Sequence, residues 1–214
     1  ALENPEVIDE GARAFGSQCI VISVDARRRF DEAGEHYVDV DGESCWFECT
    51  VKGGREGTGV DVVEWATEAE DRGAGELFVN SIDADGTKDG YDIPLTRAVC
   101  DAVSTPVIAS SGCGGPEHAY EVFTEAGADA ALAASIFHFD EHSIDDVKRH
   151  LAERGVPVRR FADARPVRAG RRSRARDAPR GSPEPSVGRQ PGRLAPTYAP
   201  SAPPPTPAES GHPG

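Results

Sequence analysis

Long apolar runs are absent from this sequence of 214 residues. No stretch approaches the roughly 18 consecutive apolar residues that a membrane-spanning helix needs, and no signal peptide is recognised. We therefore expect a cytoplasmic protein with no membrane partner.

Basic residues are scarce in the first three quarters of the chain. Residues 1–160 contain 33 acidic and 14 basic residues. This excess of negative charge argues against nucleic acid as a partner, because phosphates would be repelled. It is typical of a halophile, since a salt-rich cytoplasm screens the self-repulsion. The alternative is a partner with a basic face.

Cysteine is also sparse, and the five cysteines are odd in number and scattered. This pattern predicts neither a disulfide framework nor a metal site, because Cys45 and Cys49 have no second pair beside them. Cys19 and Cys100 lie in apolar runs, so we expect them to be small core residues. Reduced thiols are the simplest interpretation.

The composition changes near residue 160. Residues 161–214 contain 12 of the 17 prolines, nine basic residues and almost no large apolar ones. Such a segment cannot bury enough surface to offset its ordering entropy. We therefore predict one folded domain at 1–160 and a disordered Pro/Arg/Ala-rich tail at 161–214, whose arginine-rich stretch is solvated rather than a nucleic-acid patch.

The domain alternates apolar strands with helices. The first helix would have Asn4 as its side-chain cap. A long connection follows the first strand and would contain a hairpin around Asp41-Gly42. The predicted strands are continuous apolar runs rather than alternating apolar and polar residues, which favours a parallel sheet covered on both faces. Strands are predicted at 19–24, 76–80, 106–109 and 130–134, and helices at 5–15, 61–72, 92–99, 116–125 and from 143 onward. This is an α/β pattern with half the strands of a (β/α)8 TIM barrel.

Polar residues follow each predicted strand, where α/β proteins place their chemistry. Asp25 ends the first strand and Asp85 lies in the loop after the second, so we expect both at one rim, where the parallel strands end. Both carboxylates are candidates for acid–base work. A salt bridge to Arg27 or Arg28 is the alternative role for Asp25, and a solvated turn is the alternative for the Asp85 loop.

The third and fourth strand ends combine glycine backbone with serine. Residues 110–114 are Ser-Ser-Gly-Cys-Gly, and Ser135 precedes a short helical turn. Backbone N–H groups in such a loop can cradle a phosphate without a basic side chain. Tight turns with no ligand are the alternative.

Four stretches resemble the cyclase subunit of imidazole glycerol phosphate synthase, in that family's order and over residues 1 to about 160. They are ISVDARR (22–28), GAGE (73–76), SIDADGTKDGYD (81–92) and GADAALAASIFH (127–138). The sister isomerase of histidine biosynthesis shares the barrel and an Asp-Gly-Thr loop, and is the alternative. Two stretches look like the cyclase rather than the isomerase. They are Asp25-Ala-Arg at the end of the first strand and Ala-Ala-Ser-Ile-Phe-His (133–138) at the end of the fourth.

The resemblance implies a lyase of histidine biosynthesis. The family condenses ammonia from a glutaminase partner subunit with a bis-phosphorylated substrate, phosphoribulosylformimino-AICAR phosphate, and forms imidazole glycerol phosphate and AICAR. The resemblance implies no cofactor. The resemblance also implies that Asp25 is one of two catalytic aspartates and that Glu76 lies where ammonia enters the barrel. The positions it implies for substrate and phosphate are Asn80, Ser81, Asp85, Gly86, Thr87, Gly112, Ala134 and Ser135.

The chain departs from the family in two ways. It corresponds to the C-terminal half of the barrel, so we expect it to pair with an N-terminal half-barrel or a second copy, and to be feeble alone. A non-catalytic phosphate-binding half-barrel is a further alternative. The family usually has Ser-Gly-Gly at 110–112, and Ser111 would strain that turn by ~1 kcal/mol if it needs a positive φ.

Overall fold

The computed structural model describes residues 1–159. The tail predicted at 161–214, with its arginine-rich stretch, lies outside the described residues. Among the residues described, every helix is too short or too polar to cross a membrane.

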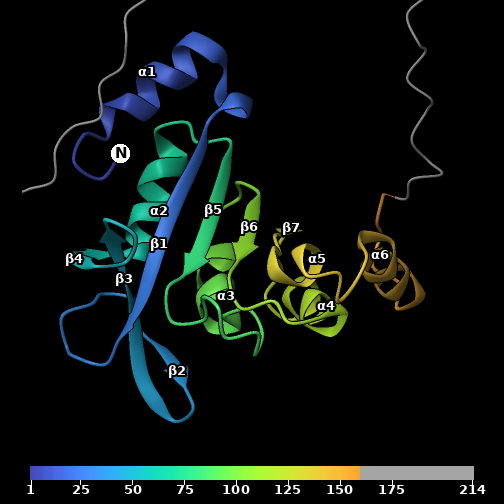
Figure 1. Cartoon of the computed structure of the whole chain (residues 1–214). Helices are drawn as coiled ribbons and strands as arrows, with labels where there is room; N and C mark the ends of the chain where they lie inside the picture. Colours follow the sequence, from blue (N-terminus) through green and yellow to red (C-terminus); the bar gives the residue numbers. More distant parts are fainter. Residues whose placement is uncertain (160–214) are drawn as a thin grey trace, which may run out of the picture. The chain divides into compact units, whose positions relative to one another are not determined.

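Four parallel strands stand next to one another in chain order, as predicted, and form an α/β half-barrel. Figure 1 shows the first three side by side. The strands are β1 (Val21–Arg29), β5 (Glu76–Ser81), β6 (Val107–Ser110) and β7 (Ala130–Ala131). The fourth is shorter than the run of alanines had indicated.

Helices connect these strands. They are α1 (Glu6–Phe15), α2 (Val62–Asp71), α3 (Ile93–Ala102), α4 (Pro116–Thr124), α5 (Ser135–His138) and α6 (Ile144–Glu153), with a 3-10 turn, η1 (Ser17–Cys19), before β1. Side chains cap three of them: Asp61 accepts from the N–H of Val63, Asp92 from Leu95, and Ser143 from Asp146. Such caps satisfy N–H groups that lack partners within the helix.

The prediction that Asn4 caps the first helix with its side chain is wrong. Pro5 occupies the cap position of α1 and no side-chain hydrogen bond caps it. Asn4 contributes only its main-chain carbonyl, which accepts a 3.4 Å hydrogen bond from Val7.

Within residues 1–159 the parallel sheet is covered on one face only, so the prediction of cover on both faces is wrong for this part of the chain. Ile22, Val24 and Ala26 of β1 are buried, whereas Val21 and Ser23 on the opposite face are exposed. The strands of β1 and β5 pair in register, so Asn80 shares the uncovered face with Asp25. This face carries the polar residues of the strand ends.

Three further strands leave the parallel sheet between β1 and α2. They are β2 (Val38–Val40), β3 (Glu43–Val51) and β4 (Glu56–Asp61). The hairpin predicted around Asp41-Gly42 is confirmed, with φ values of 56° and 87° that suit a tight hairpin turn. β3 also pairs antiparallel with the second half of β1, which is why β1 continues past Asp25 to Arg29.

One edge of β1 remains open. β3 pairs only with residues 25–29, so the first half of β1 has no neighbouring strand on that side among the residues that the structure describes. The carbonyls of Ile20 and Ala26 accept hydrogen bonds from the β5 side. Since the direction of the main-chain groups alternates along a strand, Val21 and Ser23 present theirs to the open edge.

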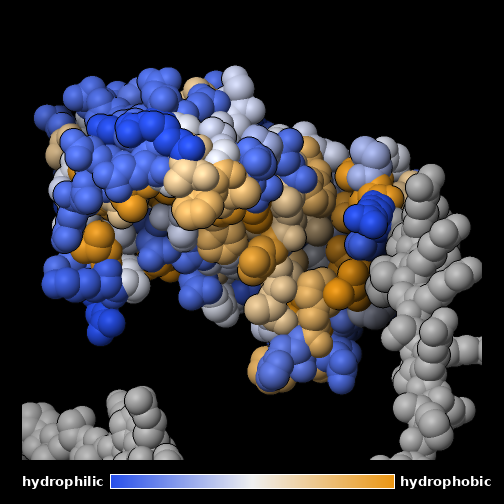
Figure 2. All heavy atoms as spheres, turned by 90° about the horizontal axis from the view of Figure 1, so that it is seen from above, coloured by the Kyte–Doolittle hydropathy of each residue, from blue (hydrophilic) through white to orange (hydrophobic). Residues whose placement is uncertain are grey.

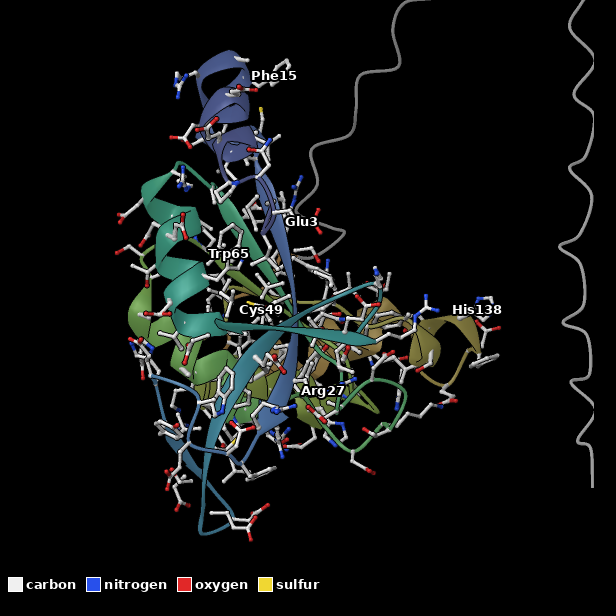
Figure 3. All side chains as sticks on the ribbon, turned by 90° about the vertical axis from the view of Figure 1, so that its left-hand side faces the viewer. Glu3, Phe15, Arg27, Cys49, Trp65 and His138 are labelled. Atoms are coloured by element: carbon white, nitrogen blue, oxygen red, sulfur yellow. The ribbon has the colours of Figure 1, made fainter. Side chains whose placement is uncertain are left out.

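A groove of about 350 Å³ lies beside this open edge. Its lining includes Leu2, Glu3, Ser23, Asp25 and Trp65. Figure 3 shows Glu3 next to β1 and Trp65 on the side of α2 that faces the strands. The groove therefore connects the strand edge with the polar end of the sheet.

The other edge of the sheet, at β7, opens onto an apolar cavity of about 630 Å³. Its lining includes Phe123 of α4, Ile136 of α5 and Leu151 of α6. Figure 2 shows apolar side chains gathered in the middle of the view and toward the α5 and α6 side, whereas the side of α1 and β4 is mostly hydrophilic. The half-barrel thus has apolar surface at its incomplete end.

The cysteines are all free among the described residues, and no cluster there could hold a metal ion. Cys45, Cys49 and Cys113 are buried and Cys100 is half-buried. The prediction that Cys19 is a core residue is wrong, because η1 leaves it exposed before β1 begins.

Candidate active site

Asp25 and Asn80 form the first pair of the site. They stand opposite each other in the parallel register of β1 and β5. Asn80 Nδ2 donates a 3.2 Å hydrogen bond to Asp25 Oδ1. The second carboxylate oxygen, Oδ2, has no hydrogen-bond partner among residues 1–159, and Asp25 stands on the uncovered face of the sheet.

Ser111 connects this pair to the central loop. Its hydroxyl lies 2.6 Å from Asn80 Oδ1 and 3.4 Å from Asp85 Oδ1. Asp25, Asn80, Ser111 and Asp85 therefore form one continuous row of polar contacts across three strand ends. The expectation that Asp25 and Asp85 lie at the same rim is confirmed by these contacts.

The alternative role for Asp25, a salt bridge to a neighbouring arginine, is not found. Arg28 pairs with the buried Asp92 at 2.9 Å, and a side-chain nitrogen of Arg27 donates to the carbonyl of Gly54. The Asp92 carboxylate raises the pKa of the Arg28 guanidinium above its ordinary value. Both arginines therefore bind other groups, and neither neutralises the Asp25 carboxylate.

The loop of residues 81–91 is held by buried polar groups. Ser81 is almost fully buried; its hydroxyl donates to Asp92 Oδ2 at 3.0 Å and accepts from the N–H of Ala84. Asp83 accepts a 2.8 Å hydrogen bond from the main-chain N–H of Arg28. Ser81 thus serves the shape of the loop with its side chain.

Asp85, Gly86 and Thr87 form the exposed tip of that loop. Gly86 has a φ of 76°, and an added Cβ there would meet no atom within 4 Å. The glycine is therefore needed for its backbone conformation rather than for space. The Thr87 hydroxyl donates to the carbonyl of Ala84 at 2.9 Å and closes the turn.

Glycines bring the loops after β5 and β6 into backbone contact. The N–H of Gly90 donates to the carbonyl of Gly112 at 2.9 Å, and a Cβ on Gly112 would lie 1.9 Å from the Gly90 oxygen. A Cβ on Gly114 would lie 2.1 Å from the carbonyl oxygen of Lys88. No side chain fits at either position, so the tight approach of the two loops requires glycine.

The fourth strand end joins the same group of loops. Ala134 is exposed and occupies the cap position of α5, and Ser135 is its first residue. The Tyr91 hydroxyl donates to the carbonyl of Leu132 at 2.9 Å, and Lys88 pairs with Glu141 at 2.5 Å. The pKa of Tyr91 is raised, mainly by burial. These contacts link β7 and α5 to the central loop.

Glu76 lies at the opposite end of the uncovered face. It is the first residue of β5 and stands opposite Val21 of β1. Asn80 lies four positions further along the strand, a distance of about 13 Å. The two residues share one face because four is an even number of strand positions.

Sequence reasoning named most of these positions but did not assign roles to Ser111 or Asp92. The Ser-Ser-Gly order was the signal for Ser111, because it places a hydroxyl where the turn would accept glycine. The only sequence signal for Asp92 is its position directly before a helix. That position predicts a helix cap, but it does not predict the contacts of Asp92 with Ser81 and Arg28.

The fold and the residues at the strand ends define the class of protein. It is an α/β half-barrel with carboxylate, amide, hydroxyl and glycine groups at the carboxyl ends of its parallel strands. A family model described as "Histidine biosynthesis protein" matches residues 1–143. The chain belongs to this family.

Several curated relatives of the chain carry the name imidazole glycerol phosphate synthase subunit HisF. The chain is 82% identical to that of Natronomonas pharaonis and 80% identical to that of Haloquadratum walsbyi, in each case over 159 residues. It is 56% identical over 164 residues to that of Methanopyrus kandleri. The match to the first two covers 74% of this chain and 59% of each relative, so the chain spans about three fifths of their length.

Proposed function

We propose that the folded domain, ending near residue 160, acts as the C-terminal half of the cyclase barrel of imidazole glycerol phosphate synthase. The observation that carries the proposal is the row of contacts from Asp25 through Asn80 and Ser111 to Asp85. The similarity to the HisF relatives favours this activity over that of the sister isomerase.

Asp25 is the acid–base group in this proposal. Its Oδ1 is occupied by Asn80, so Oδ2 is the oxygen that would exchange a proton with the substrate. A positioned acid–base group typically contributes a factor of about 10² to 10⁴ in rate. Asp85 and Gly86 would contact the substrate from the exposed loop tip.

One phosphate of the substrate would bind between the loops after β6 and β7. Gly112 has a φ of 87°, and its N–H has no main-chain acceptor among the described residues. The N–H groups at the start of α5, near Ser135, are also without partners inside the helix. N–H groups without acceptors on both loops suit an anion on an otherwise acidic protein.

The remaining half of the site would come from a second half-barrel. The open edge of β1 and the cavity beside β7 are the two surfaces that further parallel strands would cover. That half would supply the second aspartate and the second phosphate site. A second copy of this chain would close the same edges but duplicate Asp25 and Asp85.

A glutaminase subunit is the proposed source of ammonia. Glu76 lies at the end of the uncovered face opposite to Asp25, so a route along that face would pass from Glu76 to Asn80. The partner would accordingly dock at the end of the sheet where the parallel strands begin.

The test is turnover of the formimino substrate with ammonia in high salt. The chain is mixed with the N-terminal half of the Natronomonas pharaonis relative, and Asp25→Asn is compared with the wild type. We expect activity only in the mixture, and a loss of about 100-fold or more in Asp25→Asn, because the amide cannot exchange the proton. Asp101→Asn, on the exposed end of α3, is the matched control and should retain activity.

Other outcomes separate the alternatives. Halves that associate without turnover would contradict the proposed activity. Binding of the substrate without turnover, at an affinity that Asp25→Asn leaves unchanged, would indicate a phosphate-binding protein. An isomerised but uncleaved product would indicate the sister isomerase.

A further inference from the structure

Ser111 has a backbone conformation that serine rarely adopts. Its φ is 77°, in the left-handed region that favours glycine. The turn after β6 therefore contains a strained residue at a position where glycine would be relaxed. Strain of this kind persists where the surrounding structure requires it, and it gathers at functional sites.

The hydroxyl of Ser111 has a definite role in hydrogen bonding. Asn80 Oδ1, at 2.6 Å, carries no hydrogen, so the hydroxyl is the donor. A hydroxyl has a single hydrogen to donate, so the contact with Asp85 Oδ1 at 3.4 Å is secondary. Ser111 therefore acts chiefly on Asn80.

This hydrogen bond sets the orientation of the Asn80 amide. With Oδ1 bound to the hydroxyl, Nδ2 faces Asp25 and donates to its Oδ1 at 3.2 Å. A flipped amide would place two oxygens against each other at Asp25, and the Ser111 hydroxyl would have to accept from Nδ2 and turn its hydrogen toward Asp85 Oδ1, 3.4 Å away. The 2.6 Å hydrogen bond from the hydroxyl thus favours the orientation of the amide in which Nδ2 donates to Asp25.

We propose that Ser111 is a positioning residue, which holds Asn80 and through it orients Asp25. The proposal rests on the function proposed above, and it assigns no contact between Ser111 and the substrate. It explains why a serine with an unfavourable φ occupies the turn: the hydroxyl makes a contact that glycine cannot make.

Two substitutions separate the hydroxyl from the backbone strain. Ser111→Ala removes the hydroxyl and keeps the strain, whereas Ser111→Gly removes both. In the mixed barrel we expect kcat to fall about fivefold in each, which is the effect of about one ordinary hydrogen bond, with KM within about twofold. Ser111→Gly should melt at a higher temperature than Ser111→Ala, since it is free of the strain. Ser104→Ala, in the exposed loop before β6, is the control and should leave kcat unchanged.

A second measurement does not depend on turnover. The side-chain amide signals of Asn80 are followed by nuclear magnetic resonance in the full chain. We expect them to move, and their hydrogens to exchange with solvent faster, in Ser111→Ala and Ser111→Gly alike, but not in Ser104→Ala. If the wild-type mixture shows no turnover, the proposed function fails and these signals alone decide whether Ser111 positions Asn80.

The inference is overturned by either of two results. Asn80 signals that stay unchanged in both variants would show that the hydroxyl does not hold the amide. A Ser111→Gly mixture with wild-type kcat would show that the serine matters only to the turn, even if Ser111→Ala is slower.

Discussion

Cys49 and Cys19 show how different the surroundings of single residues are in this domain. Cys49 is fully buried in β3, and burial raises the pKa of its thiol to about 12. Cys19 is exposed in η1. Since the thiolate is the reactive form, burial and the raised pKa both make Cys49 slow to react, whereas Cys19 is accessible to reagents.

We predict that iodoacetamide at pH 8 modifies Cys19 well before Cys49, by a factor of at least about 100. Peptide mass spectrometry over time would measure the two rates. All five cysteines should react together in urea, which serves as the control for accessibility. Similar rates for Cys19 and Cys49 in the folded protein would contradict the placement of β3 against the core.

Helix α6 is an element whose stability depends on one carboxylate. Ser143 and Asp146 form a reciprocal capping box at its start. Hydrogen bonds from the Ser143 hydroxyl and N–H lower the pKa of Asp146. A lowered pKa in the folded state contributes stability above the unfolded value of about 3.9, and this contribution disappears as the pH falls through the folded value.

Asp146→Asn should therefore lower the melting temperature at pH 7, and this effect should diminish as the pH falls below the unfolded pKa of about 3.9. The neighbouring Asp145→Asn makes no capping contact and is the matched control. Thermal unfolding followed by circular dichroism at several pH values would measure the difference. An equal loss at pH 3 and pH 7 would show that the charge of Asp146 is not involved.

At the scale of the whole molecule, the open edges of the sheet dominate the expected behaviour. An unpaired strand edge with apolar surface nearby favours association with another chain. The excess of acidic residues opposes association between like copies at low salt, and salt screens that repulsion. We therefore expect self-association of this chain to increase with salt concentration.

Ser23→Pro tests the edge directly. Ser23 presents its N–H to the open side of β1, so proline there should reduce self-association and pairing with a second half-barrel while the domain stays folded. Val24→Pro is the contrast, because it removes a group on the β5 side and should unfold the sheet. Sedimentation in high salt would measure the mass of each. A folded wild-type monomer under these conditions would contradict the prediction.

Much of the fold and of the site follows from local features of the sequence. Apolar runs and turn residues predicted the four parallel strands and the hairpin at Asp41-Gly42, because these signals act over a few neighbouring residues. The polar residues after each run predicted the rim with Asp25 and Asp85, since parallel strands end at a common edge. The departure at Ser111 predicted the strained turn, which its φ of 77° confirms.

Tertiary structure alone decided which groups meet. Arg28 pairs with Asp92, 64 positions away, instead of with Asp25, its near neighbour. β1 extends past Asp25 because β3 lies beside it, and the polar face stays open because the described helices cover only the other one. Ser111 reaches Asn80 across 31 positions. Such contacts depend on strand register and loop geometry, which arise when the whole domain packs, so no local pattern in the sequence could specify them.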